Sequence, residues 1–217
     1  MTDPANMQLP DLPDDLTNIL RPYQKTGVAF LWNMLRAGFG VCMADDMGLG
    51  KTLQVITALE LFRRNGELAN LPALAVVPAS LLQNWMDECQ RFAPGLKVGN
   101  LHPGALSEEE KAALEQDPEK YLRRFDLVLV TYALVSRRTY LTDRTFPLIL
   151  LDEAQQIKNP SSGVSRAVRS LRGGTADRHY RHAGGKFPFR SLEYIRLHLP
   201  CPAGDARRVP GICPAHG

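Results

Sequence analysis

The sequence predicts an α/β protein in which helices cover both faces of a parallel β-sheet. Short apolar runs at residues 73–78, 126–131 and 148–152 alternate with longer segments whose apolar residues recur at helical spacing. Strands that are apolar on both faces and separated by helices are typical of buried parallel sheets. The chain has 217 residues, of which 44% are hydrophobic, so it can bury a substantial core.

The expected elements follow each other along the chain after a leader rich in proline and aspartate at residues 1–15. A further strand at residues 38–44 precedes a glycine loop. The expected helices cover residues 22–36, 52–63 and 81–92, and another begins after Ser107. Ser107 and Glu110 have the spacing of a capping box, in which each side chain binds the other residue's backbone N–H.

The composition argues against a secreted or membrane protein. No stretch approaches 18 uncharged apolar residues, and the first 20 residues lack the basic and apolar regions of a signal peptide. The four cysteines are widely spaced in a chain too large to need disulfides, so we expect reduced thiols and a cytoplasmic location.

Residues 45–52 form a predicted phosphate-binding loop between a strand and a helix. Backbone N–H groups of such a loop surround phosphate oxygens, a lysine reaches the β- and γ-phosphates, and a hydroxyl ligates Mg²⁺. The first glycine of the usual pattern would fall at Asp45, and a simple turn before an exposed helix is the alternative. The loop residues predicted to bind nucleotide are Met47, Gly48, Leu49, Gly50, Lys51 and Thr52.

Asp152 and Glu153 form the second half of the predicted ATP site. They directly follow an apolar strand, which places them at its carboxyl end. There Asp152 can hold Mg²⁺, and Glu153 can orient and deprotonate an attacking water. An acidic helix cap is the alternative for either carboxylate alone.

Five motifs in order resemble the first motor lobe of the Swi/Snf-type ATPases of helicase superfamily two, over about residues 16–171. The likeness is closest to bacterial, HepA-like members. The motifs are Leu-Arg-Pro-Tyr-Gln at 20–24, Ala-Asp-Asp-Met-Gly-Leu-Gly-Lys-Thr-Leu-Gln at 44–54, Val-Val-Pro-Ala-Ser-Leu-Leu-Gln-Asn-Trp at 76–85, Val-Thr-Tyr at 130–132 and Asp-Glu-Ala-Gln-Gln-Ile-Lys-Asn-Pro at 152–160.

The resemblance implies a RecA-like fold of the P-loop class and ATP-driven translocation on double-stranded DNA without strand separation. ATP and Mg²⁺ would be the cofactors, with Gln24 reading the adenine, Thr52 and Asp152 holding the metal, and Lys51, Asp152 and Glu153 acting in catalysis. A bacterial, nucleoid-associated location follows. The expected DNA-backbone contacts are Ser80, Asn84 and Thr131. Capping of helices is the alternative for these residues, and Trp85 is expected in the core.

Residues 172–217 differ in character from the rest of the chain. They contain 8 of the 26 basic and 3 of the 23 acidic residues, and four of the five histidines. The Thr-Gly-Thr-Pro, Glu-Asn and Trp-Ser-x-Phe-Asp-Phe segments that the family resemblance leads us to expect are absent. Codons compatible with residues 180–187 and 192–198 permit these segments when read one base out of register, so we expect a frameshifted, irregular tail.

Two functional alternatives for the tail are weaker. His198 with Cys201 and Cys213 with His216 have the spacing of zinc-ligand pairs, but we expect no zinc, since such pairs arise by chance. A basic arm that binds nucleic acid is the other alternative.

We therefore expect a truncated and incomplete first lobe that binds ATP, Mg²⁺ and, weakly, double-stranded DNA. The family strand ending in Thr-Gly-Thr-Pro lies between residues 40–44 and the strand that ends at Asp152, so its loss would leave an open gap in the sheet. A non-catalytic ATP-binding fragment and an inert pseudogene product remain as alternatives, because the family completes its site with arginines from a second lobe.

Overall fold

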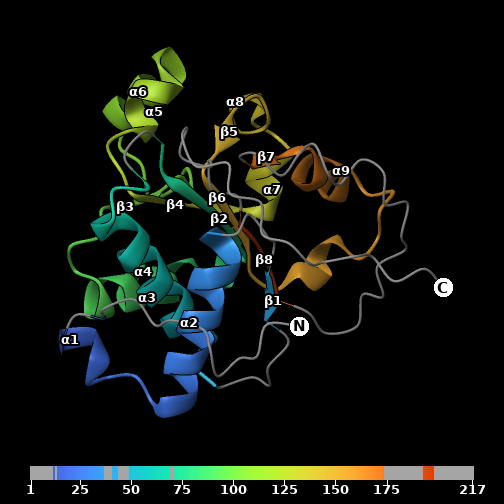
Figure 1. Ribbon diagram of the computed structural model, residues 1–217. Helices are drawn as coiled ribbons and strands as arrows, with labels where there is room; N and C mark the ends of the chain where they lie inside the picture. The colour runs from blue at the N-terminus through green and yellow to red at the C-terminus, as the bar shows by residue number, and fades with distance from the viewer. Residues whose placement is uncertain are drawn as a thin grey trace, which may run out of the picture.

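The central element of the fold is a six-stranded sheet with the strand order β1-β8-β6-β2-β4-β3 (Figure 1). The computed structural model describes residues 12, 14–36, 41–43, 49–68, 71–173 and 193–197. Strands β2, β3, β4 and β6 run parallel, whereas β8 is antiparallel to both of its neighbours. The strands are β1 (Val41–Met43), β2 (Ala73–Val77), β3 (Val98–Asn100), β4 (Leu127–Thr131), β6 (Leu148–Leu151) and β8 (Glu193–Leu197).

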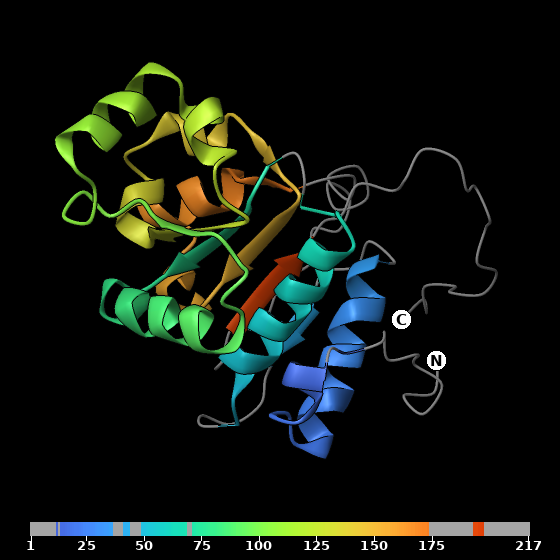
Figure 2. The ribbon, with the colours of Figure 1, turned by 90° about the vertical axis from the view of Figure 1, so that its left-hand side faces the viewer.

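Helices lie on both faces of this sheet (Figure 2). One face is covered by α2 (Pro22–Arg36), α3 (Lys51–Arg64) and α4 (Leu82–Phe92), with α1 (Asp14–Thr17) beyond them and the 3-10 turn η2 (Ala79–Leu81) before α4. The other face is covered by α5 (Glu108–Gln116), α6 (Pro118–Leu122), α7 (Tyr132–Val135), α8 (Thr139–Thr142), the 3-10 turn η3 (Ala154–Ile157) and α9 (Gly163–Ser170).

Alternate residues of each central strand enter different cores, which explains the continuous apolar runs. In β2, the side chains of Ala73, Ala75 and Val77 pack with α2, α3 and α4, whereas those of Leu74 and Val76 pack with the helices of the opposite face. All five residues are fully buried. The predicted α/β class with a doubly covered parallel sheet is confirmed.

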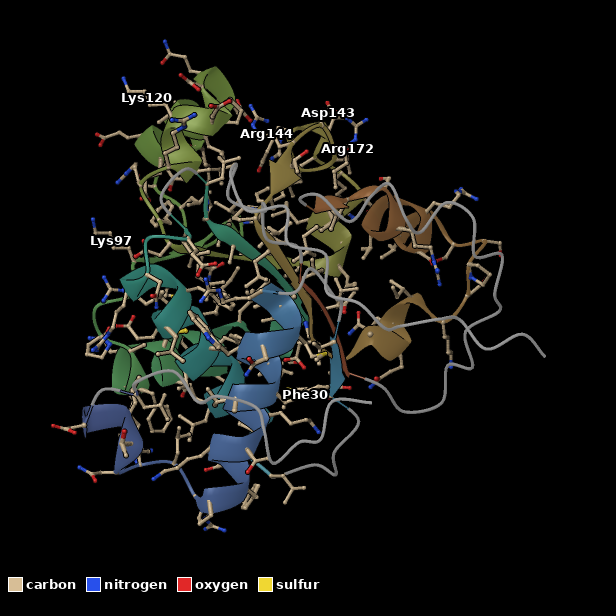
Figure 3. The ribbon with its side chains drawn as sticks, in the orientation of Figure 1. Phe30, Lys97, Lys120, Asp143, Arg144 and Arg172 are labelled. Carbon is tan, nitrogen blue, oxygen red and sulfur yellow. The ribbon has the colours of Figure 1, made fainter. Side chains whose placement is uncertain are left out.

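A small second sheet pairs β5 (Thr145–Phe146) with β7 (Arg172–Gly173). Asp143 and Arg144 lie just before β5 and Arg172 lies in β7, well away from Phe30 on α2 (Figure 3).

The thiol of Cys89 is reduced, as expected for this chain, and it is buried. Burial raises its pKa to about 12, so it is unreactive at neutral pH. Among the described residues, every helix is too short or too polar to span a bilayer.

The expected helices and the capping box are confirmed. The Ser107 hydroxyl accepts a hydrogen bond from the Glu110 N–H at 3.1 Å, and the Glu110 carboxylate accepts one from the Ser107 N–H at 3.0 Å. Pro22 begins α2 at a position where its missing N–H costs nothing. The alternative of a helix cap at Ser80 is wrong: Ser80 lies inside η2, and the N-cap residues of η2 and α4 are Pro78 and Leu81.

The expectation of an irregular tail and an open gap in the sheet needs a correction. Strand β8 lies between β1 and β6, in the place expected to be empty. Its partners in register include Val41 opposite Ile195 and Leu151 opposite Tyr194. The gap can be filled because the backbone groups of two unpaired strand edges pair with any segment that supplies donors and acceptors. The four residues of the alternative zinc pairs, at 198, 201, 213 and 216, lie outside the described residues.

Candidate nucleotide and DNA site

The predicted phosphate loop leads into the N-terminus of α3. Leu49 and Gly50 are described, whereas residues 44–48, which include Met47 and Gly48 of the predicted site, lie outside the described residues. Gly50 is the N-cap of α3 and has a left-handed backbone with φ of 71°. The N-cap residue Gly50 has no side chain to cap α3, and no acidic residue lies in the first turn of this helix. A helix start of this kind favours an anion.

Gln24, the predicted adenine-reading residue, braces this loop. It is 6% exposed, and its Nε2 donates to the Leu49 carbonyl at 3.2 Å while its Oε1 accepts from the Arg21 N–H at 2.9 Å. The Tyr23 hydroxyl donates to the same Leu49 carbonyl at 3.4 Å. A Cβ atom at Gly50 would lie 2.4 Å from Gln24 Nε2, so the brace requires glycine there.

Gln54 is a second brace that the sequence analysis did not identify. Its side chain is 2% exposed, and Nε2 donates to the carbonyls of Leu49 and Gly50, both at 3.5 Å. A Cβ atom at Gly27 would collide with its Oε1, so glycine on α2 allows the close approach. The sequence could have pointed to Gln54, because it is a polar residue at a position of the expected helix where apolar residues are buried.

Asp152 is fixed at the carboxyl end of β6 by three hydrogen bonds. Its Oδ2 accepts from Trp85 Nε1 at 2.8 Å, its carbonyl accepts from the Tyr132 hydroxyl at 2.6 Å, and its N–H donates to the Val76 carbonyl at 3.0 Å. Burial raises the pKa of Asp152, although the Trp85 hydrogen bond and the positive charge of Lys51 oppose this rise. The predicted Lys51 is therefore close enough for its positive charge to act on the predicted Asp152.

Glu153 has a strained backbone next to Asp152. Its φ of 53° and ψ of 49° lie in the left-handed region, which costs a non-glycine residue about 1–2 kcal/mol. Its carboxylate accepts a hydrogen bond from the Gln155 side chain. Strain of this kind is concentrated at functional sites.

The three predicted DNA-contact residues have different environments. Ser80 and Asn84 are exposed on η2 and α4, and the Asn84 amide donates to Glu88 at 2.9 Å. Thr131 is 8% exposed, and its hydroxyl caps α7 by accepting from the Leu134 N–H at 3.2 Å. Val77, the last residue of β2, pairs with Thr131, the last residue of β4. The three residues therefore lie at the carboxyl ends of two neighbouring strands.

The SNF2-related domain family matches residues 23–175. The chain belongs to this family. That range contains the loop before α3, the Asp152–Glu153 pair and the three residues expected to contact DNA.

Two relatives that the chain resembles are much longer proteins. It is 42% identical over 155 residues to the putative ATP-dependent helicase/translocase YwqA of Bacillus subtilis, covering 71% of this chain and 16% of that protein. It is 37% identical over 147 residues to the ATP-dependent helicase FUN30 of Saccharomyces cerevisiae, covering 66% of this chain and 13% of that protein. The matched part of the chain therefore spans only 16% of one relative and 13% of the other.

The fold matches a solved SNF2 family member. The Sulfolobus solfataricus SWI2/SNF2 ATPase core in complex with dsDNA aligns with a TM-score of 0.64 and 36% identity. The alignment covers 76% of this chain and 32% of that chain. The predicted resemblance to Swi/Snf-type ATPases, with their RecA-like fold, is confirmed.

Proposed function

We propose that this chain binds Mg²⁺·ATP and duplex DNA and acts as the first motor lobe of an ATP-dependent DNA translocase. The observation that carries the proposal is the placement of two halves of a site, with Lys51 as the first residue of α3 and Asp152 directly after β6, fixed there by Trp85 and close enough for the charge of Lys51 to act on its carboxylate. Family membership and the DNA-bound Sulfolobus relative support the same function.

The residues present fit a metal-bound nucleotide. Gly50 adds no side chain of its own at the start of α3, and N–H groups at a helix start can bind phosphate oxygens. Lys51 would contact the β- and γ-phosphates, and Thr52 and Asp152 would hold Mg²⁺. Once bound, Mg²⁺ would neutralise part of the phosphate charge. Glu153 would orient an attacking water and accept its proton.

Gln24 has a modified role in this proposal. Its amide oxygen and nitrogen both bind backbone groups of the protein, so it shapes the loop beside the adenine as well as contacting the base. Adenine would therefore compete with a bond that Gln24 makes already.

The decisive test of nucleotide binding compares two lysine variants. Lys51→Ala should weaken binding of a fluorescent ATP analogue with Mg²⁺ by at least about tenfold, because a charged donor to phosphate is lost. Lys97→Ala removes the same charge just before β3, at the opposite edge of the sheet from β1, and should leave affinity unchanged (Figure 3). Equal affinities of the two variants would refute the assignment.

DNA contact near η2 can be tested with a charge change. Ser80→Asp places a negative charge at an exposed position before α4, where it should not harm the helix. It should weaken duplex binding, and more strongly at low salt than at high salt. Gln90→Glu adds the same charge near the other end of α4 and is the control. Equal effects of both variants would argue against contact at η2.

A non-catalytic nucleotide-binding lobe is the alternative function. It is distinguished by phosphate release, measured with and without duplex DNA on the 217-residue chain. Binding of Mg²⁺·ATP without turnover would favour the alternative.

A further inference from the structure

We propose that Trp85 is a positioning residue that orients the Asp152 carboxylate for the metal–nucleotide complex. The sequence placed Trp85 only in the core, on the apolar face of α4. The inference rests on the proposed function, because it assumes that Asp152 holds Mg²⁺.

The geometry of the indole carries this inference. Trp85 is 4% exposed, and its ring packs in the core formed by α2, α3 and α4. Its single polar atom, Nε1, reaches across 67 residues of sequence to Asp152 Oδ2 at 2.8 Å. An indole N–H can only donate, so a carboxylate oxygen is a fitting partner for it in an otherwise apolar core.

The bond also selects one orientation of the carboxylate. An aspartate side chain has a broad terminal torsion, and an unbound carboxylate can therefore rotate. Oδ2 is held by a ring that the core itself immobilises. The main chain at Asp152 is anchored independently by the Tyr132 hydroxyl. Preorganisation of this kind strengthens binding because less freedom is lost when the ligand arrives.

The variant Trp85→Phe tests the role because it removes the donor and keeps an aromatic ring. Nucleotide affinity is measured twice for each protein, once with Mg²⁺ and once with EDTA. Trp85→Phe should reduce the Mg²⁺-dependent gain in affinity by about tenfold while affinity in EDTA stays the same, since a hydrogen bond to a charged group is lost. Trp32→Phe is the matched control, because Trp32 is similarly buried at 6% exposure but stacks on Phe62.

A second measurement leaves Trp85 unchanged. The chain has two tryptophans, so two indole N–H signals are expected by NMR, and Trp32→Phe assigns them. In Asp152→Ala, the Trp85 indole proton should exchange with solvent faster and move to lower chemical shift, whereas the Trp32 signal should stay. An unchanged Trp85 signal would overturn the proposal even if Trp85→Phe fails to fold.

Failure of this inference can be distinguished from failure of the proposed function. If the wild-type chain binds no nucleotide with Mg²⁺, both are overturned. If it binds, and Trp85→Phe retains the Mg²⁺-dependent gain seen in Trp32→Phe, only the positioning role is wrong.

Discussion

Replacing Gly50 by alanine should damage the nucleotide site more than replacing Gly66, although the two glycines have nearly the same backbone. Their φ angles are +71° and +73°. A Cβ atom at Gly50 would lie 2.4 Å from Gln24 Nε2, whereas one at Gly66 would meet nothing within 4 Å. Gly66→Ala thus measures backbone strain alone, and Gly50→Ala adds a collision with the brace.

The expected magnitudes follow from these contacts. A left-handed alanine costs about 1–2 kcal/mol, of which about 0.4–1 kcal/mol is offset because alanine reduces the freedom of the unfolded chain. Gly66→Ala should therefore destabilise the fold by about 1 kcal/mol, lowering Tm by about 2–4 °C in a chain of this size. Gly50→Ala also displaces a buried amide from the Leu49 carbonyl, which adds about 1–3 kcal/mol.

Thermal unfolding and ATP titration together check the reasoning. Gly50→Ala should lose at least about tenfold in Mg²⁺·ATP affinity, while Gly66→Ala should bind like wild type. In a Gln24→Ala background the collision partner is gone, so Gly50→Ala should then cost no more stability than Gly66→Ala. Equal losses of Tm for the two variants in the wild-type background, or an unchanged ATP affinity of Gly50→Ala, would refute the role of the Gln24 amide in holding the loop.

Three further outcomes are expected. Burial raises the pKa of Glu60, but hydrogen bonds from Arg63 and Arg64 outweigh this effect and hold the pKa below its usual value. The stability that this shift provides is present above the pKa of Glu60 in the unfolded chain, and it is lost as pH falls through its pKa in the folded protein. Glu60→Gln should therefore flatten the loss of Tm between about pH 5 and pH 3 in thermal scans. Tyr132→Phe should cost about 0.5–1.5 kcal/mol in chemical denaturation, since it removes the 2.6 Å bond to the Asp152 carbonyl. We propose that the codons of residues 172–217 are read out of frame; sequencing the coding DNA should show Thr-Gly-Thr-Pro one base out of register near residue 181, and any other bases there would exclude it.

The sequence predicted those features that depend on local pattern. Strand β2 could be found because both of its faces enter a core, and the capping box at Ser107 could be found because its partners lie three residues apart. Asp152 could be placed because an apolar strand ends there. Each of these depends on neighbours in sequence or on burial, which an amino-acid pattern records directly.

Contacts between distant segments could not be predicted in the same way. The bond from Trp85 to Asp152 joins residues 67 positions apart, and the apolar face of α4 gave no sign that one ring atom binds a carboxylate. Thr131 was expected at DNA with helix capping as the alternative, and its hydroxyl does cap α7; contact with DNA stays a prediction. The left-handed backbone of Glu153 likewise depends on how η3 leaves the sheet.

Strand β8 shows why the tail escaped prediction. Ladder pairing uses backbone groups alone, so a segment needs only a few β-forming residues, such as Tyr194 and Ile195, to pair between β1 and β6. Its antiparallel direction places Glu193 opposite Met43, at the edge of the sheet where β1 leads to the phosphate loop. A parallel strand would instead end at that edge and deliver the residues that follow it to the site. Pairing of the sheet and supply of site residues are therefore separate requirements, and a segment that lacks the family motif can meet the first without meeting the second.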